Sequence, residues 1–283
     1  MKPELTLERF LEVFVPGVLI AVGTWYLHRP LLATYFPLVA SDLSLLDDIT
    51  TALGGKAFVF SVIAVTLGLI CNHLSDIAIV GLVDDKCESP KARRRDRALF
   101  RIMMRPFVFK PSPDPRIVHV NRYMESPRSQ TFISMLRDWT GTDAEALRKP
   151  DASVTAHQHI LTHLLVVSQD IRAIVTDMYR PVSISASLFA ASALLLPISL
   201  LSFLSRSFVI GRAAVLPVGF HIVASITIYG FAILAGYSLR RRYRHYCAQV
   251  LTLGLHAYIK EKGLNEMGGQ QTPLVDDYVA REA

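Results

Sequence analysis

Four long apolar segments constrain the fold of this chain more than any other feature of its sequence. A helix needs about 20 mostly apolar residues to cross the hydrocarbon core of a bilayer. Within lipid such a segment must be helical, because a helix pairs its own backbone amides and carbonyls. Soluble helices of this length and purity are rare, which disfavours a soluble four-helix core. The sequence therefore predicts four transmembrane helices, at Phe10–Leu27, Ala57–Leu82, Val182–Leu204 and Ala213–Tyr237.

The distribution of lysine and arginine predicts the orientation of these helices. All but four of the 30 Lys and Arg residues precede the first apolar segment, lie between the second and third, or follow the fourth. Basic residues near the ends of spans stay on the cytoplasmic side. We therefore expect a multi-pass protein of the inner (plasma) membrane, with both termini and the middle of the chain in the cytoplasm. The exceptions fall on the opposite side: Arg29, Lys56, Arg206 and Arg212.

Bulk composition agrees with a membrane protein. Apolar residues make up 51% of the chain and charged residues 19%. The isoelectric point near 9.3 reflects the arginines that set the orientation, so it does not indicate nucleic-acid binding. Cys71, Cys87 and Cys247 are too few for a disulfide framework, and the two predicted to be cytoplasmic should be reduced.

The predicted fold is all-α, with four transmembrane helices and a helical cytoplasmic domain. The connection between the second and third spans and an extension of the fourth would form that domain. Spacings of three and four from Leu239 to Ala257 predict the extension, which could pair as a coiled coil or dock on the helix at 151–180. The expected divisions are 1–83 with an outer loop at 28–56, then 84–181, 182–237, 238–262 and a flexible tail at 263–283.

Three elements are expected within the cytoplasmic domain. Arg116–Val120 could form a short strand. Helical spacing over Ser129–Trp139 predicts a helix that ends before Gly141. A long helix from Asp151 should run toward the membrane and kink or restart at Pro181, where the third span begins.

A basic helix is predicted beside the second span. Arg93, Arg97, Arg101 and Arg105 recur every four residues and so line one helix face. The favoured interpretation is a helix resting on anionic lipid headgroups. The alternatives are a site for an anionic ligand, nucleotide or RNA, and an ordinary solvated surface.

The second span carries a small or polar stripe. It comprises Ser61, Ala64, Gly68, Asn72 and Ser75. His73 and Asp76 lie near its cytoplasmic end. Ionisable groups inside lipid are costly and usually face protein or water, so one interpretation is a pore-lining or proton-linked face. The other is that Asn72–Asp76 lie at the membrane interface.

The third and fourth spans carry further polar residues. Ser192 and Ser199 are seven apart in a span rich in small residues, which indicates close helix packing or, alternatively, a hydroxyl-lined water path. His221 in the fourth span is interpreted as a packed, hydrogen-bonded histidine, with a gate or proton relay as the alternative. The predicted intramembrane set takes five small or polar positions from the second span and three from the other two spans: Ser61, Gly68, Asn72, His73, Asp76, Ser192, Ser199 and His221.

No residue pattern indicates catalysis, a metal or a cofactor. His159 and His163 are one helical turn apart, but His157 points elsewhere and no glutamate follows His159 as a zinc protease would need. Nucleophile elbows, phosphate-binding loops and paired catalytic carboxylates are missing from the sequence. We expect a protein that is not an enzyme, with lipid chemistry at Asn72–Asp76 as the remaining enzymatic hypothesis.

The predicted function is a homo-oligomer that forms or gates a pore under control of its cytoplasmic helices. The layout alone is similar to that of bestrophin-type channels and of compact bacterial membrane effectors, which implies a role such as antiviral defence. The alternative is a non-conducting anchor or sensor that recruits a cytosolic partner or an anionic ligand, such as a nucleotide, through the basic helix. The expected partners are anionic lipid headgroups and further copies of the chain.

Overall fold

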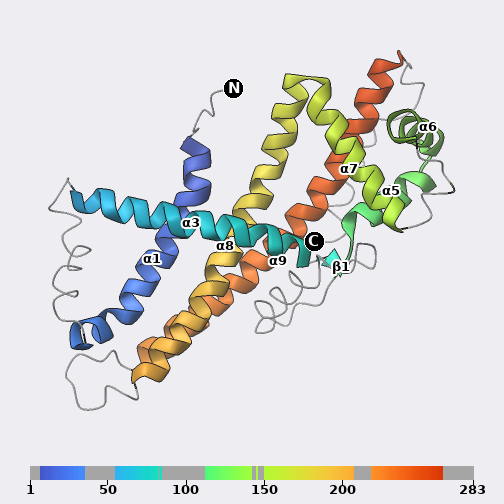
Figure 1. Cartoon of the computed structure of the whole chain (residues 1–283). Coiled ribbons are helices and arrows are strands. Elements are labelled where there is room, and N and C mark those ends of the chain that lie inside the picture. The colour runs from blue at the N-terminus through green and yellow to red at the C-terminus, as the bar shows by residue number, and fades with distance from the viewer. Residues whose placement is uncertain are drawn as a thin grey trace. The chain divides into compact units, whose positions relative to one another are not determined.

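A computed structural model describes residues 7–35, 55–81, 83–84, 112–141, 145, 150–206 and 218–263 (Figure 1). These residues are helical apart from short connections and a two-residue parallel pairing of β1 (Val83–Asp84) with β2 (Ser112–Pro113). The helices are α1 (Leu7–Tyr35), α3 (Gly55–Gly81), α5 (Pro115–Glu125), α6 (Ser129–Thr140), α7 (Pro150–Val167), α8 (Gln169–Arg206) and α9 (Val218–Glu261).

The chain divides into two units. Unit 1 comprises α1, α3 and the parts of α8 and α9 at 183–206 and 218–239. Unit 2 comprises the β1–β2 pair, α5, α6, α7 and the parts of α8 and α9 at 169–182 and 240–261. Both long helices therefore contribute to each unit, and each unit is described by itself below.

Within the described residues, three helices are long and apolar enough to cross a membrane. The candidate spans are Ser61–Ile79 in α3, Gln169–Leu201 in α8 and Gly219–Glu261 in α9. The described apolar stretch of α1, Glu12–Thr24, is shorter than a full span. A membrane-embedded, all-helical chain is thus supported, while the fourth span remains a prediction.

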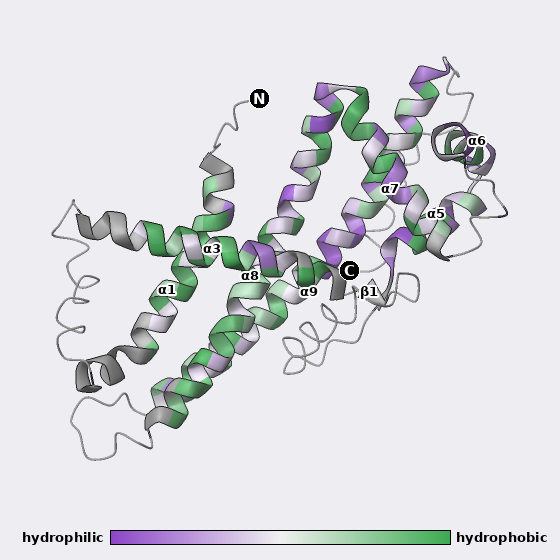
Figure 2. Ribbon diagram, in the orientation of Figure 1, coloured by the Kyte–Doolittle hydropathy of each residue, from purple (hydrophilic) through white to green (hydrophobic). Residues whose placement is uncertain are grey.

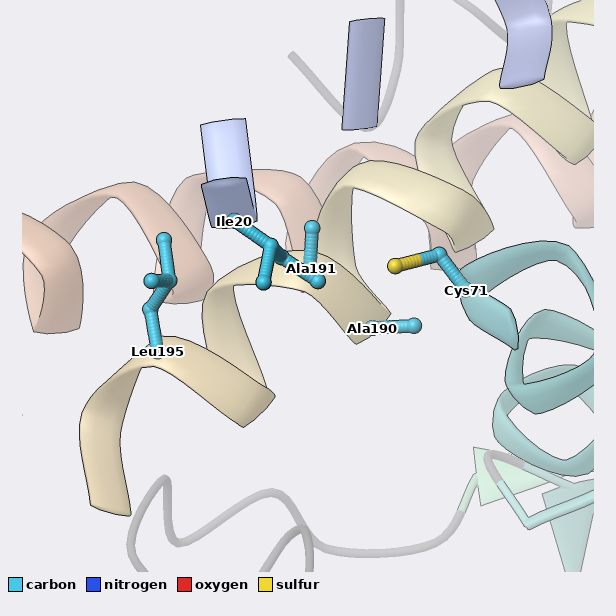
Figure 3. Packing of buried hydrophobic residues seen from close by; sticks show 5 residues of the cluster. All are labelled: Ile20, Cys71, Ala190, Ala191 and Leu195. Carbon is cyan, nitrogen blue, oxygen red and sulfur yellow. The ribbon is translucent and has the colours of Figure 1, made fainter. Parts of the chain in front are cut away.

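Small side chains allow the helices of unit 1 to pack closely. Ile20 of α1, Cys71 of α3 and Leu195 of α8 meet around Ala190 and Ala191 (Figure 3). Unit 1 also exposes large apolar side chains, as lipid-facing helices do. They include Val15, Leu19, Val62, Ile63, Leu69, Leu201, Leu204, Val223, Ile226 and Leu234.

Two glycines fix the crossing of α1 and α3. A Cβ at Gly17 would overlap the carbonyl of Ala64, and a Cβ at Gly68 would overlap the carbonyl of Val13. The two backbones can approach this closely only because neither residue has a side chain.

Unit 2 has an apolar core of its own, formed where α6 and α7 pack against the C-terminal part of α9. Gly254 of α9 lies against Ile160 of α7, whose Cγ2 would be 2.7 Å from an added Cβ. Tyr123 of α5 hydrogen-bonds Thr252 of α9 at 2.7 Å between hydroxyls. Docking of the α9 extension on the helix that starts near residue 151 is therefore observed. The largest fully buried side chains among the described residues of the unit are Val120, Phe132, Met135, Leu136, Ile160, Leu164, Val182, Leu251 and Leu255.

Two expectations for unit 2 are wrong. Arg116–Val120 lies in the first turns of α5 and is not a strand, because Asp114 caps the helix and Pro115 occupies its first turn. The long helix predicted over 151–180 breaks at Ser168 and continues through Pro181. The Ser168 hydroxyl accepts a hydrogen bond from the Ile171 amide at 3.1 Å and so caps the new helix. The helix predicted over Ser129–Trp139 is confirmed, and Gly141 ends it with a φ of 65°.

Candidate functional site

The polar stripe predicted on α3 does not form one continuous surface. Gly68 is buried at the crossing with α1, and Ser61 is half-buried. Asn72 and His73 are exposed. Asp76 belongs to α3, but its side chain lies outside the described residues. The structure therefore leaves Asn72 and His73 as a pair of adjacent exposed polar residues on α3.

The predicted serines of α8 are buried within unit 1. The Ser192 hydroxyl donates to the carbonyl of Leu188 at 2.8 Å. The hydroxyls of Ser199 in α8 and Ser225 in α9 hydrogen-bond each other at 2.8 Å. A second pair, Ser185 and Ser238, joins the same two helices at 3.4 Å. These contacts favour the packing interpretation over a water path lined by serine.

His221 of α9 is buried in an aromatic environment. Only 3% of the residue is exposed. Its ring meets Phe203 and Phe220 edge to face, at centroid distances of 6.1 and 6.0 Å. This environment favours a packed histidine. The four arginines of the predicted basic helix, Arg93, Arg97, Arg101 and Arg105, lie outside the described residues.

The three histidines of α7 lie in different surroundings. His159 is exposed, whereas His163 stacks on Trp139 at a centroid distance of 4.0 Å. His157 is buried. Across the described parts of the chain, no group of three or more His, Cys, Asp or Glu side chains is placed to hold a metal ion.

A buried ion pair at the start of α5 was not anticipated from the sequence. Asp114 is 1% exposed and accepts the Arg116 amide at 2.8 Å, which caps the helix. The Arg116 guanidinium also donates to both Asp114 oxygens, through Nε at 3.0 Å and Nη2 at 2.6 Å. The signal that could have revealed this site is an aspartate directly before a proline, which is typical of a helix start.

His157 connects α7 to α9 near this ion pair. Its Nε2 lies 3.3 Å from the carbonyl oxygen of Cys247. Burial lowers the pKa of His157 to about 4, with smaller opposing effects from the charges of Arg116 and Asp114. The imidazole is therefore neutral near pH 7 and can donate from Nε2 to the carbonyl. The Cys247 thiol is fully buried, as inert structural cysteines are. The hydrogen bond between His157 and Cys247 thus joins α7 to α9, and the charges of Asp114 and Arg116 at the start of α5 act on the same histidine.

The chain matches no protein-family model, no curated protein and no solved structure. Its function is therefore inferred from its own residues and their geometry.

Proposed function

We propose that the protein is a multi-pass inner-membrane protein that assembles as a homo-oligomer and gates a pore. Unit 2 lies in the cytoplasm and acts as the control element. The supporting observation is the continuity of two helices: α8 spans 38 residues and α9 spans 44, each passing from unit 1 into unit 2 without a break. We infer that a ligand or partner bound to unit 2 acts through these helices on their apolar parts, which Figure 2 colours green.

The exposed pair on α3 supports assembly. Asn72 and His73 follow the exposed Leu69 and Ile70, with the buried Cys71 between the two pairs. Polar side chains in contact with lipid are unfavourable, so a second copy or a water-filled path would cover Asn72 and His73. Four helices are too few to enclose a pore within one protomer, which is why the proposal requires several copies. The small size and layout of the chain suit an effector in bacterial defence.

The proposal predicts that conductance depends on the exposed pair. Purified protein reconstituted into planar bilayers should show single-channel currents. The double variant Asn72→Leu/His73→Leu should reduce conductance at least tenfold, because it replaces the polar lining by apolar side chains. Thr66→Val is the matched control: Thr66 is an exposed polar residue of the same helix, and its hydroxyl donates to the Val62 carbonyl at 2.8 Å. It should leave conductance unchanged.

The proposal fails if no current appears at any voltage and the protein is a monomer by native mass measurement. If both α3 variants conduct like the wild type, Asn72 and His73 do not line the pore, and that part of the proposal fails.

A second candidate function is a non-conducting anchor or sensor. It is favoured by exposed apolar residues around the junction of α7 and α8 in unit 2, where Val166 is 79% exposed. The patch consists of Leu165, Val166, Val167 and Ile174. Recovery of a stable cytosolic partner with the wild type, its loss with Val166→Asp, and absence of conductance would together favour this function.

A further inference from the structure

Five arginines gather where α8 and α9 pass into unit 2. Arg241, Arg242 and Arg244 of α9 are exposed, while Arg240 of α9 and Arg180 of α8 are half-buried. We call these five residues the arginine cluster. It is distinct from the basic helix predicted at residues 93–105, and it contains no lysine. Figure 2 shows hydrophilic residues following the apolar part of α9.

The cluster is held together across two helices. Successive residues of a helix are about 100° apart, so Arg240, Arg241 and Arg244 share one face of α9. Arg242 projects elsewhere and its Nη1 donates to the carbonyl of Pro181 in α8 at 3.1 Å. The same end of α8 carries Arg180, whose guanidinium is 3.2 Å from Asp177. Guanidinium groups from both helices therefore lie on one part of unit 2.

The sequence at the cluster is rich in basic residues. Asp177 pairs with Arg180, and the sequence of α9 holds no acidic residue before Glu261. Arg240 and Arg244 are four residues apart, a spacing at which like charges destabilise a helix. A bound anion would relieve this repulsion.

Tyr237 indicates where the cluster lies relative to the membrane. It is in the last apolar turn of α9 and is 63% exposed. Exposed tyrosines concentrate at the level of lipid headgroups. With a rise of about 1.5 Å per residue, the arginines at 240–244 lie within roughly 5–10 Å of Tyr237 along the helix axis.

We propose that the arginine cluster binds the phosphodiester headgroups of anionic phospholipids in the cytoplasmic leaflet. One guanidinium group can donate two parallel hydrogen bonds to two oxygens of the same phosphate, and a lysine ammonium cannot. Arg241 and Arg244 provide the exposed contacts, and Arg242 extends the site to α8. This inference goes beyond the proposed function and does not depend on conductance, since an anchor would bind the same lipid.

The test compares phosphatidylglycerol with phosphatidylcholine on the full chain in detergent. Thermal unfolding and native mass spectrometry report stabilisation and retained lipid. Phosphatidylglycerol should raise the Tm of the wild type and remain bound, whereas phosphatidylcholine should do neither. The variant Arg241→Gln/Arg242→Gln/Arg244→Gln should bind phosphatidylglycerol at least tenfold more weakly. A matched control, Arg137→Gln/Arg172→Gln/Lys260→Gln, removes three exposed basic residues of unit 2 outside the cluster and should bind within twofold of the wild type.

Three results would overturn the inference. One is equal loss of lipid binding in the two triple variants, which would indicate a general effect of charge. Another is stabilisation by inorganic phosphate or glycerol 3-phosphate equal to that by phosphatidylglycerol, which would indicate a soluble ligand. If the cluster variant does not fold, the test uses the wild type alone. Its stabilisation by phosphatidylglycerol should weaken as the salt concentration is raised. Stabilisation that does not depend on salt would contradict the proposal.

Discussion

A Gly68→Ala protein is expected to unfold at a much lower temperature than the wild type. The added Cβ would overlap the carbonyl of Val13, so α1 and α3 must separate. Overpacking usually costs about 1–3 kcal/mol, and the cost here should reach at least the upper end because a backbone atom, unlike a side chain, has no rotamer to change. Gly17→Ala should behave similarly, since its Cβ would meet the carbonyl of Ala64. Thermal unfolding of the purified protein in detergent measures both.

Gly230→Ala provides the control for this prediction. Gly230 also lies in an apolar part of a helix, but an added Cβ would have nothing within 4 Å. The substitution should be neutral or stabilising by up to about 1 kcal/mol, because alanine favours the helix more than glycine does. Equal Tm values for Gly68→Ala and Gly230→Ala would contradict the close crossing of α1 and α3.

Asp114→Asn is expected to destabilise unit 2 strongly. The carboxylate is buried, caps α5 and binds the guanidinium of Arg116 through both oxygens. Removing one partner of a buried pair costs about 3–5 kcal/mol, because the other charge stays buried after losing that partner. The loss should appear as a lower Tm. The double variant Asp114→Leu/Arg116→Met should recover part of it, since no charge is then left buried.

Asp138→Asn tests whether burial of the carboxylate is what makes Asp114→Asn so destabilising. Asp138 also accepts two hydrogen bonds, from the Tyr258 hydroxyl at 2.9 Å and from Lys262 at 3.0 Å. These bonds lower the pKa of Asp138, yet its side chain is 39% exposed, so water can replace them. The effect should be far smaller than that of Asp114→Asn. If both variants lower the Tm by a similar amount, burial of the Asp114–Arg116 pair is not the reason for its contribution to stability.

The sequence reveals the helices of unit 1 better than those of unit 2. Uninterrupted apolar runs locate α3, α8 and α9 because lipid permits few alternatives to a helix. The break at Ser168 was missed because apolar residues keep helical spacing on both sides of it, from Leu164 to Ile174. Its capping signal is a serine followed by Asp170 in the first turn of α8, and this signal is weaker than the interruption that Pro181 indicates. A proline in a long helix can be accommodated when its neighbours compensate.

The candidate site shows a similar limit. Helical spacing places Ser61, Gly68 and Asn72 on one stripe, but it does not say that α1 covers Gly68 and leaves Asn72 exposed. The pairing of Ser199 with Ser225 likewise depends on how α8 and α9 pack. The hydrogen bond between His157 and Cys247 joins positions far apart in sequence, so no local pattern predicts it.

Cysteine accessibility tests the central claim, that unit 2 faces the cytoplasm from a membrane-embedded chain, most directly. A cysteine would be introduced at Val166 after Cys71, Cys87 and Cys247 are replaced by serine or alanine. Val166 is the most exposed large apolar residue in the described part of unit 2. A maleimide that does not cross the inner membrane should label it only after that membrane is permeabilised, whereas a cysteine at Asp42, in the predicted outer loop, should react in intact cells. Labelling of the Val166→Cys protein in intact cells would contradict the account.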